Sequence, residues 1–187
     1  MTTKSGSEII AGWPEESREA ASLVIKEYGE PHERTESLLI WEGVGPFKRV
    51  IASRAFYQHD FPVPHTDSVE SVVDYRVPIE KFGPLAEFDG SVVVERTAGE
   101  ASARCHDVQA NSLALNLTHD IVSGAKSVDE ARNYYAKEFL DYRRNKPTPY
   151  MDELTISSSN GGTADPDHRV LSQEDLDAAV KEGKAGR

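Results

Sequence analysis

The chain has 187 residues, of which 38% are hydrophobic and 28% charged, and its net charge is −11. This length is typical of one domain, and the negative charge is opposite to what a phosphate-binding surface requires, so we expect no nucleic-acid partner. No apolar run approaches the ~20 residues of a membrane span, no secretory signal is visible, and the single cysteine, Cys105, cannot form an intrachain disulfide. These features predict a soluble cytoplasmic protein without a membrane partner.

An amphipathic helix is predicted over residues 14–29. Pro14 suits the first turn of a helix, and the two glutamates after it suit the positive end of the helix dipole. Gly29 is a favourable helix end, and Pro31 prevents continuation. Between them, apolar residues recur at helical spacing and define one face: Ala20, Ala21, Val24, Ile25 and Tyr28.

Three β-strands are predicted next, over residues 37–42, 47–57 and 69–77. The first two are apolar and aromatic and flank a Gly-Val-Gly-Pro turn, so they read as a hairpin. That turn lacks the Gly-Lys-Ser/Thr ending of a phosphate-binding loop, and we interpret it as structural. Residues 78–88 are predicted to form either two short helical turns or a loop.

A second hairpin is predicted over residues 91–106. Its first strand is rich in valine, and its second, from Glu100 to His106, alternates small apolar residues with polar ones. The intervening Ala-Gly allows a tight reversal. The alternative is a helix that begins at Thr97, because Thr97 and Glu100 have the spacing of a capping box. We favour the hairpin.

Two antiparallel helices are predicted to follow. Asp107 caps the first helix, and Ser127 with Glu130 forms a capping box that opens the second. Consecutive strands with helices near the chain ends predict an α+β fold. We expect an antiparallel sheet of about five strands, with one N-terminal and two C-terminal helices packed on one face.

The domain organisation follows from a change in composition near residue 156. Residues 1–156 carry the large apolar residues of a single globular α+β domain. Residues 157–187 are polar and acidic, and we predict a mostly flexible tail with a short helix over 172–182. A terminal helix docked on the domain is the alternative.

The best candidate site is the connection Tyr57–Asp67 between the second and third strands. It contains His59, Asp60, His65 and Asp67, and two prolines stiffen it. Binding residues are often carried on loops that a rigid scaffold positions. We therefore predict that these four residues bind a ligand.

A metal centre is a second interpretation of this loop. His65 and Asp67 have the His-x-Asp spacing that places two ligands on one side of an extended segment. His106, at the end of the fifth predicted strand, would complete a His/Asp/His triad suited to non-haem iron or zinc. His59 or Asp60 would be an alternative ligand or general base. The competing interpretation has exposed histidines, with aspartates that only cap turns.

Two further polar residues are interpreted as structural. Cys105 is followed by a histidine and an aspartate, but neighbouring residues of a strand point to opposite faces. We therefore predict that Cys105 is a small buried core residue. Asn116 lies beside the apolar stripe of the first C-terminal helix, and we expect its amide to bind the backbone of a neighbouring segment.

The function that these features favour is non-catalytic binding. The ligand would be a small molecule at residues 57–67, or a protein partner on the open sheet face along Arg49, Ser53 and Asp74. A metal-dependent enzyme with iron or zinc is the first alternative. A structural or assembly subunit, including a homo-oligomer, is the second.

Overall fold

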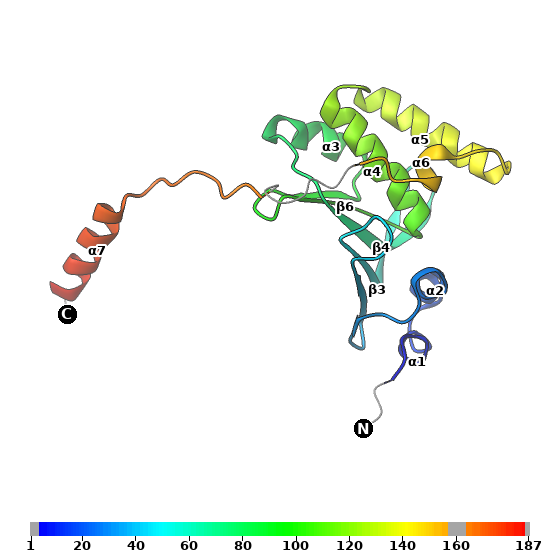
Figure 1. The fold of residues 1–187 in the computed structure, drawn as a ribbon, viewed down its shortest axis with the longest axis horizontal. Helices are drawn as coiled ribbons and strands as arrows, with labels where there is room; N and C mark the ends of the chain where they lie inside the picture. The colour runs from blue at the N-terminus through cyan, green and yellow to red at the C-terminus, as the bar shows by residue number, and fades with distance from the viewer. Residues whose placement is uncertain (1–3, 157–163, 186–187) are drawn as a thin grey trace.

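Six strands form one antiparallel sheet, in the order β1-β2-β3-β4-β6-β5, in a computed structural model that describes residues 4–156 and 164–185 (Figure 1). The predicted α+β class is confirmed. The expected count of about five strands omitted a two-residue edge strand, because its Glu-Arg sequence carries no apolar signal. The strands are β1 (Glu33–Arg34), β2 (Leu38–Glu42), β3 (Arg49–His59), β4 (His65–Asp74), β5 (Val92–Glu95) and β6 (Glu100–Cys105).

The second hairpin is present as predicted. β5 pairs with β6 in antiparallel register, with Val92 opposite Ala103, so the alternative helix from Thr97 is wrong. β6 lies between β4 and β5, and the chain crosses from β4 to β5 through two short helical elements. These elements are η1 (Ile79–Lys81) and α3 (Phe82–Phe88), which occupy the stretch predicted as helical turns or a loop.

The remaining helices are α1 (Gly6–Ile10), α2 (Glu15–Tyr28), α4 (Val108–Ser123), α5 (Val128–Arg143), α6 (Pro149–Asp152) and α7 (Gln173–Ala185). α2 packs on β3 and β4, and α4 packs on β4 and β6. α5 packs chiefly on α4 and α3, so it forms an outer layer above α4 (Figure 1). Of the C-terminal pair α4 and α5, it is therefore mainly α4 that contacts the sheet.

The core lies between the sheet and the helices because alternate strand residues point to that side. Val50, Ser71 and Ala103 lie side by side across β3, β4 and β6, and each is 0% exposed. The buried hydroxyl of Ser71 accepts a hydrogen bond from Asn111 of α4 at 3.0 Å. α4 is thereby fixed over the centre of the sheet.

Local signals set the helix ends. Gly29 ends α2 with a φ of +79°, a conformation that costs glycine little. Its carbonyl accepts a hydrogen bond at 2.9 Å from the indole of Trp41, a fully buried residue of β2. The predicted caps are present: Asp107 accepts from the amide of Ala110, and Ser127 opens α5 with a complete capping box.

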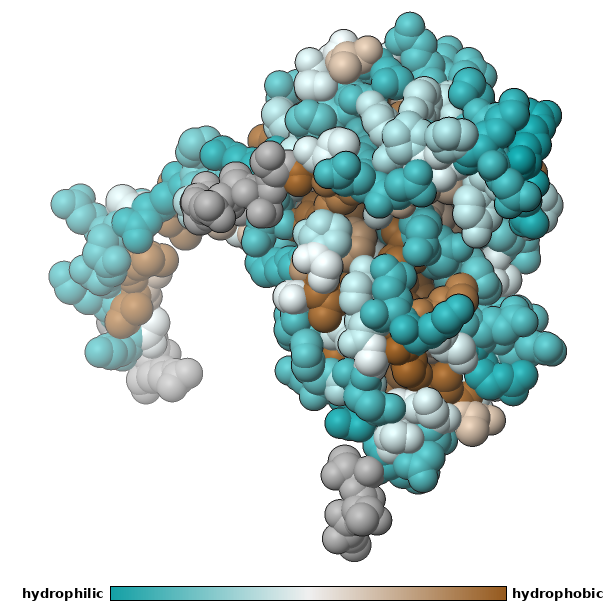
Figure 2. All heavy atoms as spheres, turned by 45° about the vertical axis from the view of Figure 1, so that its right-hand side comes forward, coloured by the Kyte–Doolittle hydropathy of each residue, from teal (hydrophilic) through white to brown (hydrophobic). Residues whose placement is uncertain are grey.

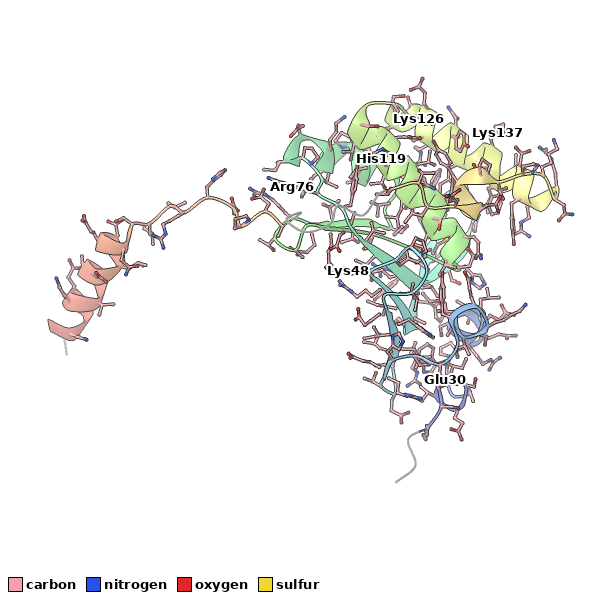
Figure 3. All side chains as sticks on the ribbon, viewed as in Figure 1. Glu30, Lys48, Arg76, His119, Lys126 and Lys137 are labelled. Carbon is pink, nitrogen blue, oxygen red and sulfur yellow. The ribbon has the colours of Figure 1, made fainter. Side chains whose placement is uncertain are left out.

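The opposite sheet face carries paired charges. Arg49 and Glu100 form a two-point ion pair, with one of its contacts at 3.0 Å. Lys48 lies 2.7 Å from Asp74 and 2.9 Å from Glu100, and it projects from the sheet on the side away from α2 (Figure 3). No helix covers this network among the described elements.

The C-terminal helix α7 stands away from the sheet at the end of an extended segment (Figure 1). All its described side chains are exposed, including Leu176 and Val180, and Figure 2 shows apolar side chains on this arm. α7 overlaps the helix predicted over 172–182, and the start of the predicted tail, residues 157–163, lies outside the described residues. No helix in the described part of the chain combines the length and apolar content that crossing a membrane requires.

Candidate metal centre

The hairpin of β3 and β4 brings two histidines and an aspartate together. β3 ends at His59 and β4 begins at His65, and these residues are paired directly across the two strands. Asp67 follows two residues later, so its side chain lies on the same side of β4 as His65. One ligand atom from each of the three residues lies within 4.8 Å of the other two.

Each imidazole turns one nitrogen toward the carboxylate of Asp67. Nε2 of His65 lies 3.0 Å from Oδ1, and Nδ1 of His59 lies 3.2 Å from Oδ2. On its other side, Nδ1 of His65 lies 2.8 Å from the carbonyl oxygen of Val63. A carbonyl oxygen only accepts, so this Nδ1 carries a hydrogen, and Nε2 faces the carboxylate of Asp67, where it binds a cation only after it loses its own proton.

The outer nitrogen of His59 faces a second buried carboxylate. Its Nε2 lies 3.6 Å from Oδ1 of Asp89, which follows the end of α3 and is 2% exposed. Oδ1 of Asp89 also accepts hydrogen bonds from the amide and hydroxyl of Ser91, at 2.8 and 2.7 Å. A hydrogen-bond acceptor behind each imidazole is typical of histidine ligands of metals; here Val63 is within hydrogen-bond distance of His65, and Asp89 lies slightly beyond that distance from His59.

The inner atoms of the cluster are buried and lack hydrogen bonds. Asp67 is 4% exposed. Its Oδ1 and the Nδ1 of His59 have no hydrogen bond of adequate geometry among the described residues, although Oδ1 lies 3.0 Å from Nε2 of His65 and Nδ1 lies 3.2 Å from Oδ2 of Asp67. Buried polar atoms without such bonds are rare in folded proteins, and an unrecorded ion is one of the explanations.

The electrostatics of the cluster favour a cation. Burial alone would lower the pKa of His65, but the carboxylate of Asp67 and the sulfur of Cys105 outweigh it and raise the pKa to about 11. The carboxylate therefore stabilises positive charge on this imidazole, and a metal ion bound by Nε2 would have to displace its proton.

Comparisons of the chain with protein-family models, curated proteins and solved structures find no match.

The structure separates the residues of the predicted site. His59, His65 and Asp67 lie together, whereas Asp60 is exposed, and its carboxylate accepts a hydrogen bond from Gln58 at 3.4 Å. The two histidine side chains are 18% and 19% exposed, so they are not freely solvated loop residues.

His106 is not part of the group that the described residues form. Cys105 pairs with Val69 of β4, so its side chain lies on the same sheet face as that of Asp67. His106 follows Cys105 directly and therefore does not share that face. The residue grouped with His65 and Asp67 is instead His59, which was predicted as an alternative ligand, and Asp89 was not predicted. The only signal at Asp89 was an Asp-Gly turn, which does not reveal that α3 ends beside the β3–β4 hairpin.

A pocket of about 170 Å³ borders the cluster. His65 and Cys105 form part of its wall, and the Sγ of Cys105 lies 3.3 Å from Nε2 of His65. Cys105 is 8% exposed, as expected of a core residue, and burial raises the pKa of its thiol. The remaining wall is mainly apolar and comes from the β3–β4 connection, α5 and α6, together with the β6–α4 link and the start of α4, which add the polar residues His106, Asp107 and Gln109.

Proposed function

We propose that this protein binds a divalent transition-metal ion through Nδ1 of His59, Nε2 of His65 and the carboxylate of Asp67, and uses it to hold a small ligand. The observation that carries the proposal is the orientation of the two imidazoles. Their outer nitrogens face a carbonyl and a carboxylate, and their inner nitrogens converge on a buried carboxylate. This proposal combines the predicted ligand site with the predicted metal.

The donor set narrows the metal. Two imidazole nitrogens with one carboxylate are typical of iron(II) sites with open coordination positions, and of catalytic zinc sites. Ions that require all-oxygen coordination, such as magnesium and calcium, fit this set poorly. Zinc and iron(II) are therefore the ions to test first.

A metal-dependent enzyme is the second candidate function. It is favoured by the small number of protein ligands beside a pocket, because open positions on the metal can bind a substrate or a water molecule. The visible spectrum of the cobalt(II)-substituted protein distinguishes a metal site with open positions from a four-coordinate site that Cys105 closes. Weak visible absorption would indicate a site with more than four ligands, whereas strong absorption with a thiolate band would indicate that Cys105 closes a four-coordinate site.

A protein partner on the open sheet face has less support. The charges of Arg49, Lys48, Glu100 and Asp74 pair with one another on that face. A partner would have to displace these pairs or leave them in place, and neither favours tight binding.

The proposal is tested by metal titration of protein stripped with a chelator. Isothermal titration and elemental analysis should give one zinc or iron(II) ion per chain. His59→Ala and Asp67→Asn should weaken binding by at least ~100-fold, and Asp89→Asn, which removes an outer contact, by ~10–100-fold. His106→Ala and Asp60→Asn are the matched controls and should bind normally. The proposal fails if wild-type protein takes up no stoichiometric metal, or if His106→Ala loses as much affinity as His59→Ala.

A further inference from the structure

We infer that the pocket beside the metal centre binds a small apolar carboxylate with a single ring or a branched chain, of about the size of benzoate. The inference rests on the proposed metal site and specifies its ligand. It is carried by the volume of the pocket, the chemistry of its wall and the charges at its two ends.

The volume limits the ligand to one ring. The pocket measures about 170 Å³. An apolar cavity of ~150 Å³ engineered in another protein binds benzene, so a monocyclic compound fits a space of this size and a fused bicyclic compound does not.

The wall suits an apolar body. Phe139 of α5 is partly buried, Tyr135 is 3% exposed and Met151 of α6 is 6% exposed, and all three line the pocket. Pro62 and Val63 close it from the β3–β4 connection. Aromatic rings pack favourably against one another and against a thioether, which gives this wall a preference for a ring or a branched hydrocarbon.

The charges at the two ends favour an anion. Cys105 and His65 line the pocket, and Cys105 is 8% exposed, so a metal ion held by Nε2 of His65 would lie beside this buried end and could supply a positive charge there. Arg143 lies in the exposed part of the wall, with its guanidinium 5.2 Å from the ring centroid of Phe139. Over residues 4–156 and 164–185 no carboxylate lies within 4.0 Å of this guanidinium.

One acidic residue, Asp107, also lines the pocket. Its carboxylate accepts a hydrogen bond at 2.8 Å from the amide of Ala110, where it caps α4. That contact directs its charge to the positive end of the helix. A ligand carboxylate would therefore bind the metal at the buried end, with its apolar body against Phe139 and with Arg143 at the mouth.

The test uses zinc-loaded full-length protein and four probes: benzoate, benzyl alcohol, benzylamine and 2-naphthoate. Titration calorimetry should show binding of benzoate that falls at least ~10-fold when zinc is removed, a change of ~1.4 kcal/mol. The alcohol, the amine and the bicyclic acid should bind at least ~10-fold more weakly than benzoate. Arg143→Gln should weaken benzoate by a few-fold, with the loss diminishing as salt rises.

Two variants fill the pocket from opposite walls. Phe139→Trp enlarges a partly buried side chain, and Val63→Trp enlarges one that is 41% exposed, so at least the second should fold normally by its thermal transition. Both should lose benzoate binding and keep one zinc per chain. The inference is overturned if zinc binds and benzoate does not, if 2-naphthoate binds as tightly, or if Val63→Trp retains benzoate. Absence of zinc binding overturns the metal proposal as well, so the two failures are distinguishable.

Discussion

Replacement of Asn116 by alanine should destabilise the protein and loosen one wall of the pocket. Asn116 lies on α4 and is 1% exposed. Its Nδ2 donates to the carbonyl oxygens of Tyr150 and Glu153, at 3.0 and 2.8 Å, and its Oδ1 accepts from the amide and hydroxyl of Thr155, both at 2.8 Å. This one side chain therefore fixes the segment that contains Met151, as the sequence analysis expected of a buried amide.

The magnitude follows from these four contacts. Each hydrogen bond contributes ~0.5–1.5 kcal/mol net, so we expect a loss of about 3 kcal/mol in the free energy of unfolding. In a chain of this size, that loss corresponds to a fall of about 6–12 °C in Tm. Asn111 is the matched comparison because it is 0% exposed on the same helix, but its Nδ2 makes only two such contacts, to Val69 and Ser71. Asn111→Ala should cost about 1–2 kcal/mol.

Urea denaturation of both variants measures these losses. The Thr155 amide donates a hydrogen bond to Oδ1 of Asn116 in the native state. Its hydrogen exchange should therefore accelerate in Asn116→Ala and stay unchanged in Asn111→Ala. Benzoate affinity should fall in Asn116→Ala, while zinc stoichiometry remains that of the wild type. A cost below ~1 kcal/mol, or one no larger than that of Asn111→Ala, would refute the reasoning from hydrogen bonds.

Two further predictions concern pH and the tail. The ion pair with Arg49 lowers the pKa of Glu100 below its ordinary 4.5. The stabilisation of the folded protein by this ion pair is therefore present above pH 4.5 and is lost as pH falls below that value. Glu100→Gln should cost about 2 kcal/mol at pH 7, and the difference from wild type in urea denaturation should shrink toward pH 3; an unchanged difference would contradict this. Truncation after Ile156 removes α7 and three ion pairs, of Asp165 with Arg96 and Arg76 and of Asp167 with Arg96, so the unfolding free energy should fall by no more than ~2 kcal/mol. Light scattering should give the same oligomeric state with and without the tail, and a changed state would instead support an assembly role.

The parts of the fold that sequence predicted are those with local causes. Asp107 and the pair Ser127 and Glu130 cap helices through bonds within a few residues, so their pattern is visible in the chain itself. The β5–β6 hairpin depended on a choice between a turn and a capping box. Tertiary burial favours the hairpin, because Ala101 and Ala103 are buried on the side of β6 that faces α4. A helix would not place these two alanines on one face of the sheet.

The candidate site depended on register, which sequence could not provide. The connection between the strands was predicted to run from Tyr57 to Asp67, but β3 continues to His59 and β4 begins at His65. A register shift in β3 between Ala52 and Tyr57 allows this longer pairing. Such an irregularity has no sequence signature strong enough to predict, yet it decides that the two histidines face each other.

The composition of the cluster is difficult to explain by stability alone. His59, Asp67 and Asp89 are mostly buried, and two of their polar atoms lack hydrogen bonds among the described residues. Burying ionisable groups is unfavourable unless they are paired and hydrogen-bonded, and apolar residues at these strand ends would stabilise the sheet more. A cation between the inner nitrogens and the carboxylate would satisfy all three groups at once, while the outer nitrogen of His59 faces Asp89 at the end of α3. These features are what the proposed metal site would require, and they favour the proposal over a purely structural cluster.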